Sequence, residues 1–133
     1  MPQRSLHDTR FFVEYFYSEN SDLLRKLRED LRSTRERLVS VVTIHEMHRI
    51  DLENEGKEVA AMRSETVRRD FEVLEIDYEI AVKSAALRSL HRIPMADSLI
   101  AATAEFRKSP VVSDDPHFQR IESIKTLWYT TSD

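Results

Sequence analysis

Short runs of β-branched and aromatic residues alternate with longer helical stretches along this chain, and this alternation limits the possible folds more than any other feature. The runs predicted as strands are Leu38–Val42, Phe71–Ile76, Val111–Ser113 and Ile124–Tyr129. A weak first strand, with Leu6 as its only apolar anchor, ends at His7. This order predicts an α/β fold with three layers, α/β/α, in which helices cover both faces of a small, mainly parallel sheet. Helix content should be high, because the helical stretches outnumber and outlast the strands.

The predicted helices follow residues that commonly cap a helix. Asp8 precedes the first helix, and a second over residues 22–38 follows Asn20-Ser21-Asp22. Thr43-Ile-His-Glu46 has the capping-box pattern, which predicts that Thr43 caps a helix running to about Gly56. Further helices are expected over residues 57–69, after Asp77, within residues 93–108 and, briefly, after Asp115.

Length and composition favour one ordinary domain over residues 1–133. The absence of cysteine excludes disulfides and thiolate metal sites and fits a reducing compartment. No apolar run approaches the roughly 20 residues of a membrane helix, and the first residues do not resemble a secretion signal. We therefore expect a cytoplasmic protein without a membrane partner. Gly56 is the only glycine, which excludes a glycine-rich phosphate loop or dinucleotide site.

The charge balance does not suggest a general nucleic-acid binder. The formal net charge is −4, from 20 basic and 24 acidic residues, whereas such binders are more often basic. An average of this kind can still hide a local acidic site beside basic rims. Arginine outnumbers lysine 15 to 5, which suits phosphate contacts and ion pairs alike.

Four acids stand where an α/β sheet would bring them to one edge. Asp8, Glu46 and Asp115 each follow a predicted strand, and Asp97 begins the predicted helix that carries many small and apolar residues. Ligands of open α/β sheets bind outside the carboxyl ends of the strands. Four carboxylates there would repel each other strongly without a cation, and oxygen ligands suit Mg²⁺ or Mn²⁺.

Each of these acids also has a purely structural interpretation. Asp8 and Asp115 are good helix caps, and Pro116 would then occupy the first helical position. Glu46 completes the capping box, and the helix dipole favours an acid at the position of Asp97. Capping and a shared site do not exclude each other, because helix starts in this architecture lie at the same edge as the strand ends.

Four segments together resemble a known family. These are Asp8-Thr9, Val42-Thr-Ile-His-Glu46, Asp97-Ser-Leu-Ile-Ala-Ala-Thr-Ala104 and Val111-Val-Ser-Asp-Asp-Pro-His-Phe118. Over nearly its whole length the chain is similar to PIN domains, specifically the small toxin ribonucleases of the VapC type. Two features depart from the family pattern. The first strand is usually a clear apolar run, and a small or amide residue commonly stands where this chain has Arg10.

The resemblance implies a metal-dependent endoribonuclease that hydrolyses phosphodiester bonds in structured RNA. Its Mg²⁺ or Mn²⁺ ions would be held by Asp8, Glu46, Asp97 and Asp115, with Asp114 as an additional candidate ligand. Without these four acids the net charge would be zero instead of −4, so the rest of the protein is balanced. Thr9 and Ser113 are candidate helpers, and the residues suggested for a phosphate-binding rim are Arg10, Arg88 and Arg92.

The resemblance also implies partners. A VapC-type toxin would be a homodimer and would pair with an antitoxin whose peptide covers the acidic groove. Two alternatives stay open: a PIN nuclease that processes RNA without being a toxin, and a silent PIN-like binding scaffold. The presence of all four acids weighs against the scaffold.

Other chemistry is disfavoured by residue spacing. His45 and His48 are three residues apart, whereas the histidines of the zinc-protease helix motif are four apart. His91 and His117 are isolated in the sequence and are predicted to be structural or to face solvent. No base partner is evident for a nucleophilic serine, which disfavours a serine hydrolase.

Overall fold

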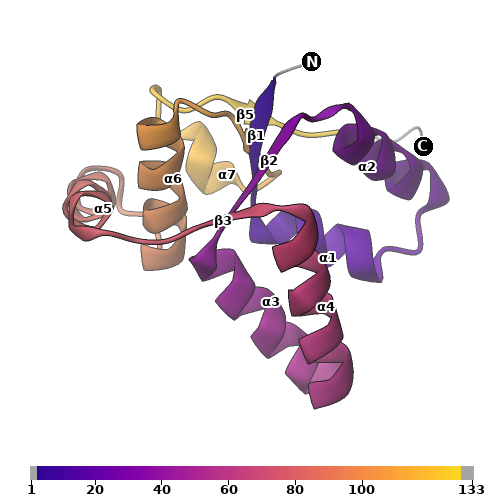
Figure 1. Ribbon diagram of the computed structural model, residues 1–133. Helices are drawn as coiled ribbons and strands as arrows, with labels where there is room; N and C mark the ends of the chain where they lie inside the picture. Colours follow the sequence, from indigo (N-terminus) through magenta and orange to yellow (C-terminus); the bar gives the residue numbers. More distant parts are fainter. Residues whose placement is uncertain (1–2, 130–133) are drawn as a thin grey trace.

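Within the described part of the chain, five parallel strands form one sheet at the centre of the protein (Figure 1). The computed structural model describes residues 3–129, so both ends of the predicted 1–133 domain lie outside the described residues. The strand order is β3-β2-β1-β4-β5, and every neighbouring pair is parallel. The strands are β1 (Arg4–His7), β2 (Glu36–Ser40), β3 (Glu72–Leu74), β4 (Val111–Val112) and β5 (Thr126–Leu127).

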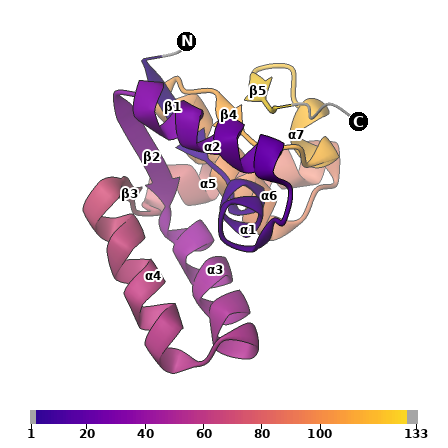
Figure 2. The same cartoon turned by 90° about the vertical axis from the view of Figure 1, so that its right-hand side faces the viewer.

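Helices cover both faces of this sheet. They are α1 (Thr9–Tyr17), α2 (Ser21–Ser33), α3 (Val41–Asn54), α4 (Lys57–Asp70), α5 (Tyr78–His91), α6 (Met95–Arg107) and α7 (Pro116–Gln119). In Figure 1, α5, α6 and α7 lie on one side of the strands and α1 to α4 on the other. Figure 2 shows α3 and α4 as a hairpin that extends away from the sheet, and Gly56 turns the chain between them with a positive φ of 93°. None of the helices within residues 3–129 is both long and apolar enough to cross a bilayer.

Alternating side chains of the strands divide the core into two parts. Leu6, Leu38 and Val111 pack with residues of α5, α6 and α7. Val39 and Val112, which directly follow Leu38 and Val111 in the sequence, pack with residues of α1 to α4. Because successive residues of a strand point to opposite faces, the two clusters are the two sides of one sheet. The predicted three-layer architecture is confirmed.

The weak first strand forms, and a polar pair completes its burial. The His7 side chain is fully buried, and its Nε2 lies 2.7 Å from Oδ2 of Asp30 on α2. Asp30 also accepts a hydrogen bond from the hydroxyl of Tyr129, and the His7 ring packs edge-on against Phe11. A buried histidine with a buried carboxylate partner thus stands where an apolar residue was expected.

Helix α3 begins three residues earlier than the capping-box pattern predicted. Strand β2 ends at Ser40, whose Oγ accepts a hydrogen bond from the backbone N–H of Val42 at 3.1 Å. Thr43 therefore lies inside α3, and its prediction as the N-cap, with Glu46 folding back on it, was wrong. Since Ser40 is a good cap, the helix can begin with two β-branched valines that by propensity would extend the strand.

Other boundaries also shift without changing the order of the elements. The helix predicted over residues 22–38 ends at Ser33, because β2 begins at Glu36. The strand predicted over Phe71–Ile76 shortens to Glu72–Leu74, and the last predicted strand shortens to Thr126–Leu127.

Replacement of the cap should weaken the protein. We expect Ser40→Ala to lower the free energy of unfolding by about 1 kcal/mol, since an orphan backbone N–H of α3 loses its acceptor. Urea denaturation measures the change. Ser89→Ala, at an exposed position of α5, is the matched control and should be neutral or slightly stabilising. Equal losses in both variants would contradict Ser40 as the cap.

Candidate functional site: a carboxylate cluster at the carboxyl edge of the sheet

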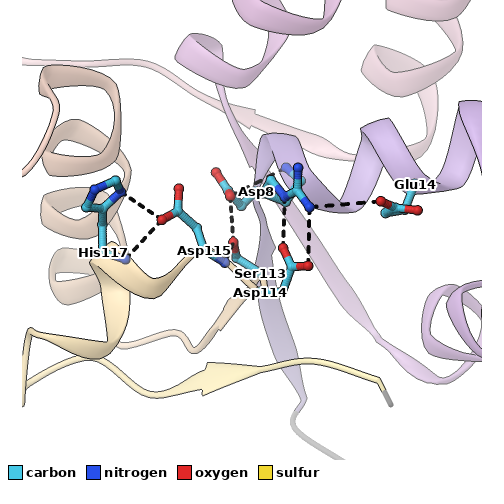
Figure 3. A network of polar contacts seen from close by, with 7 residues as sticks. Asp8, Glu14, Ser113, Asp114, Asp115 and His117 are labelled. Carbon is cyan, nitrogen blue, oxygen red and sulfur yellow. Dashed lines mark hydrogen bonds and ion pairs between the residues drawn. The ribbon is translucent and has the colours of Figure 1, made fainter. Parts of the chain in front are cut away.

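Asp8 and Asp115 are joined through Ser113. Asp8 directly follows β1, caps α1 and is 2% exposed. Ser113 follows the neighbouring strand β4, and its hydroxyl donates a hydrogen bond of 2.7 Å to Oδ2 of Asp8 (Figure 3). The same Oγ accepts from the backbone N–H of Asp115 at 3.0 Å. Pairing of β1 with β4 therefore brings two acids that are distant in sequence to one edge.

Asp97 and Asp115 meet at the side chain of His117. Asp97 lies in the first turn of α6, and Asp115 caps the short helix α7 by accepting from the backbone N–H of His117 at 2.9 Å. Nδ1 of His117 is 2.8 Å from Oδ2 of Asp97 and 2.8 Å from Oδ1 of Asp115. The two helix starts thus present two carboxylates and one imidazole to the same point.

Glu46 reaches the cluster from α3 through Thr9. The Thr9 hydroxyl lies 2.5 Å from Oε1 of Glu46, to which it donates, and 3.2 Å from Oγ1 of Thr43. Thr9 is the residue after Asp8, so this contact holds Glu46 beside the first strand end. Glu46 is half-buried on the second turn of α3.

Electrostatic interactions connect all four acids. Burial raises the pKa of Asp8 to about 6, with a smaller contribution from the charge of Glu46 and opposition from the Ser113 hydrogen bond. Burial also raises the pKa of Asp97 to about 7, and the charges of Asp115 and Asp8 raise it further, while His117 opposes them. The charge of Glu46 therefore acts on Asp8, and the charges of Asp8 and Asp115 act on Asp97. The four carboxylates thus occupy one region of the molecule.

Asp114 is engaged with Arg10. Nε and Nη2 of Arg10 donate to the two carboxylate oxygens of Asp114 at 2.8 and 3.3 Å, and Nη2 lies 3.9 Å from Oε1 of Glu14 (Figure 3). A pocket of about 250 Å³ is lined by Arg10, Asp114, Asp115 and Pro116. Arg10 is therefore placed at the margin of the cluster, and Asp114 is occupied by a bidentate ion pair.

Arg88 and Arg92, the other residues suggested for the phosphate rim, lie elsewhere. Both are exposed and line a pocket of about 600 Å³ between α5 and α6. None of the four clustered acids lines that pocket. Within residues 3–129, no described contact joins either arginine to the carboxylates, and their role stays a prediction.

His117 is the site residue that was missed. It was expected to be structural or to face solvent, but its ring contacts both Asp97 and Asp115. Its position two residues after a helix-capping acid was the only signal in the sequence, and that signal does not reveal the contact with α6. His48, by contrast, is partly buried and hydrogen-bonded to Ser64 at 2.7 Å.

The donors present at this edge fit a divalent cation. Asp97, Asp115 and His117 each offer a donor atom, and these atoms lie within 4.8 Å of one another. Carboxylate oxygens are the ligands of Mg²⁺ and Mn²⁺, and imidazole is accepted by transition metals. The raised pKa of Asp8 and Asp97 reflects burial and mutual repulsion that a bound cation would offset.

Fold and site together define a class: a three-layer α/β domain in which acids from four separate parts of the chain meet at the carboxyl edge of a parallel sheet. A model of the PIN domain matches residues 6–124. The chain therefore belongs to the PIN domain family. No curated protein matches the sequence.

Solved structures show the same fold. A chain of the VapBC2 complex of Rickettsia felis bound to promoter DNA superposes with a TM-score of 0.78 at 15% identity, covering 96% of this chain and 99% of that one. DNA-bound VapBC of Salmonella typhimurium gives 0.77 at 18% identity, covering 96% and 98%. VapC20 of Mycobacterium tuberculosis, described as a toxin that cleaves the sarcin–ricin loop, gives 0.73 at 12%, covering 87% and 93%.

Proposed function

We propose that this PIN domain is a metal-dependent endoribonuclease that hydrolyses phosphodiester bonds in structured RNA. The observation that carries the proposal is the convergence of Asp8, Glu46, Asp97 and Asp115, two of which have a raised pKa. Incubation of the purified protein with structured RNA tests the proposal. Cleavage is expected with Mg²⁺ or Mn²⁺ and should stop when EDTA is added.

The four carboxylates are the proposed ligands of the ion. When bound, Mg²⁺ or Mn²⁺ would lower the pKa of a water molecule and stabilise negative charge on the phosphoryl group. The chain itself supplies orientation. Ser113 holds the Asp8 carboxylate against the start of α7, and Thr9 holds Glu46, so both acids are fixed before substrate arrives.

Arg10 is the proposed phosphate contact at the margin of the site. Its side chain is about half exposed, and Asp114 fixes its guanidinium beside Asp115. A planar guanidinium can donate two hydrogen bonds to a phosphate and so offset the repulsion between RNA and the acids. Asp114, predicted as an additional metal ligand, is better explained as the residue that positions Arg10.

Loss of the Thr9 hydroxyl should slow cleavage. We expect Thr9→Val to lower the single-turnover rate constant of cleavage about tenfold, because a hydrogen bond to a charged group contributes about 1.5–3 kcal/mol and only part of it acts on the transition state. Single-turnover cleavage of a short RNA hairpin at saturating Mn²⁺ measures the effect. Thr66→Val on α4, at a partly buried position outside the cluster, is the control. A Thr9→Val enzyme with the wild-type rate would show that Glu46 does not depend on this contact.

We further propose that the protein is the toxin of a type II toxin–antitoxin pair. Two of the structures that support this are of VapBC complexes, and a third, VapC20, is called a toxin that cleaves the sarcin–ricin loop. An antitoxin would neutralise the acidic edge with an arginine or lysine side chain. Induction in a bacterial host should arrest growth, and sequencing of new RNA 5′ ends should locate the cleaved bond. Cleavage of a precursor RNA without growth arrest would favour the processing nuclease.

The proposed homodimer has a candidate surface on α5 and the start of α6. Tyr78, Val82, Leu90 and Met95 are exposed by 82%, 55%, 76% and 59%, which is unusual for side chains of this kind. Sedimentation equilibrium at micromolar concentration should give twice the chain mass. A monomer at that concentration would remove the dimer from the proposal.

A further inference from the structure

The imidazole of His117 lies among the carboxylates in a way that a simple ion pair does not explain. Nδ1 is 2.8 Å from an oxygen of Asp97 and 2.8 Å from an oxygen of Asp115. Nevertheless, this atom is buried and has no hydrogen-bond partner, although a third of the side chain is exposed. Its nitrogen is thus withheld from solvent and directed between two acids without the geometry of a hydrogen bond to either.

The spacing of these three donors suits a shared cation. Adjacent ligands of an octahedral ion bound at 2.0–2.1 Å are about 3 Å apart. The two distances from Nδ1 to the carboxylates are close to that value, and all three donor atoms lie within 4.8 Å of one another. Asp97 comes from the start of α6, whereas Asp115 and His117 come from the start of α7.

We propose that His117 is a nitrogen ligand of the cation bound by Asp97 and Asp115, and that it makes this site prefer Mn²⁺ to Mg²⁺. Mg²⁺ is held almost entirely by oxygen, whereas imidazole binds transition metals well and Mg²⁺ poorly. This inference rests on the cation site of the proposed function and adds a fifth side chain and a metal preference to it.

Calorimetric titration of the whole chain with Mn²⁺ and, separately, with Mg²⁺ tests the preference. We expect His117→Gln to weaken Mn²⁺ binding by at least about tenfold, since even outer partners of metal sites contribute about 10–100-fold to affinity. Mg²⁺ binding should change by less than about threefold, because Mg²⁺ does not use the nitrogen. His91→Gln, at the end of α5, is the matched control and should bind both ions as the wild type does.

Pulsed electron paramagnetic resonance of bound Mn²⁺ provides a readout that does not depend on activity. The wild type should show coupling of Mn²⁺ to one ¹⁴N nucleus, and His117→Gln should lose it. Absence of nitrogen coupling in the wild type would overturn the proposal and does not require the variant to fold. Equal loss of Mn²⁺ and Mg²⁺ affinity in His117→Gln would also overturn it and would make His117 a positioning residue.

The proposed function can fail separately from this inference. Asp97→Asn should abolish tight binding of both ions, whatever His117 does. If Asp97→Asn binds Mn²⁺ like the wild type, the carboxylate cluster is not the cation site and the proposed function fails. If Asp97→Asn loses Mn²⁺ and His117→Gln does not, only the nitrogen ligand is refuted.

Discussion

Asp97→Asn should lower the rate of RNA cleavage by about a thousandfold. Loss of a carboxylate ligand removes several kcal/mol of transition-state stabilisation, and each 1.36 kcal/mol corresponds to a factor of ten. Asp97 is central to the cluster, because the charges of both Asp115 and Asp8 act on it. Single-turnover cleavage at saturating Mn²⁺ measures the loss.

A second acid at a helix start supplies the control. Asp77 caps α5 by accepting from the backbone N–H of Ile80 at 2.9 Å. It is not among the acids that the cluster brings together. Because asparagine caps a helix about as well as aspartate, Asp77→Asn should keep both stability and activity. If Asp97→Asn cleaved RNA at the rate of Asp77→Asn, the assignment of the catalytic cluster would be refuted.

Asp97→Asn should also make the metal-free protein more stable. A loss of activity in this variant therefore cannot be explained by a loss of folding. Burial and the neighbouring carboxylates raise the pKa of Asp97 to about 7, so at pH 8 the folded state carries an unfavourable charge. An amide removes that charge. We expect a gain of about 1–2 kcal/mol in the free energy of unfolding in EDTA, after allowance for solvent screening of a partly exposed group.

The second large effect is a fall in metal-free stability as the pH rises from about 4 to about 7. The pKa values of Asp8 and Asp97 are raised in the folded protein to about 6 and about 7, from 3.8. Below pH 3.8 these carboxyls are protonated in both states and cost nothing. Between the pKa of each carboxyl in the unfolded chain and its raised pKa in the folded protein, only the unfolded chain ionises. Ionisation therefore stabilises the unfolded state relative to the folded state. Buried Asp8 alone accounts for up to about 3 kcal/mol.

Mn²⁺ should reverse this loss at pH 8. A ligand that binds only the folded state at a hundred times its Kd adds about 2.7 kcal/mol to the free energy of unfolding. At pH 4 the ion should have little effect, because the raised pKa values of Asp8 and Asp97 keep these two carboxyls protonated. Urea denaturation with EDTA or Mn²⁺ at several pH values measures both effects. If Mn²⁺ did not change the free energy of unfolding at pH 8, the result would favour the silent scaffold.

Several site residues were recognisable from the sequence because their signals are local. Asp8 stands directly after β1 and Asp115 three residues after β4, and each caps the next helix, as predicted. Asp97 lies in the first turn of a helix whose residues from Ser98 to Ala104 are almost all buried, and the small side chains of this segment predicted that burial. Such signals act within a few residues of the chain, so they survive without knowledge of the tertiary structure.

One local interpretation was wrong, and one strand looked weaker in the sequence than it is. The β-branched pair Val41-Val42 was predicted to be strand, but the Ser40 cap begins α3 there. The first strand forms as predicted, and it looked weak because its polar residue His7 pairs with Asp30, which lies 23 residues further along on α2. The intrinsic preference of a residue for helix or strand contributes a few tenths of a kcal/mol. A single cap or a single buried polar pair contributes more than that.

By itself, the sequence determined the order of strands and helices, the three-layer architecture and the capping roles of Asp8 and Asp115. Only the tertiary structure decided which polar groups meet: Ser113 with Asp8, 105 residues apart, His117 with Asp97, and Arg10 with Asp114. The physical reason is range. Caps and apolar periodicity depend on neighbours along the chain, whereas a hydrogen bond depends on tenths of an ångström between side chains that only the packed sheet and helices bring together.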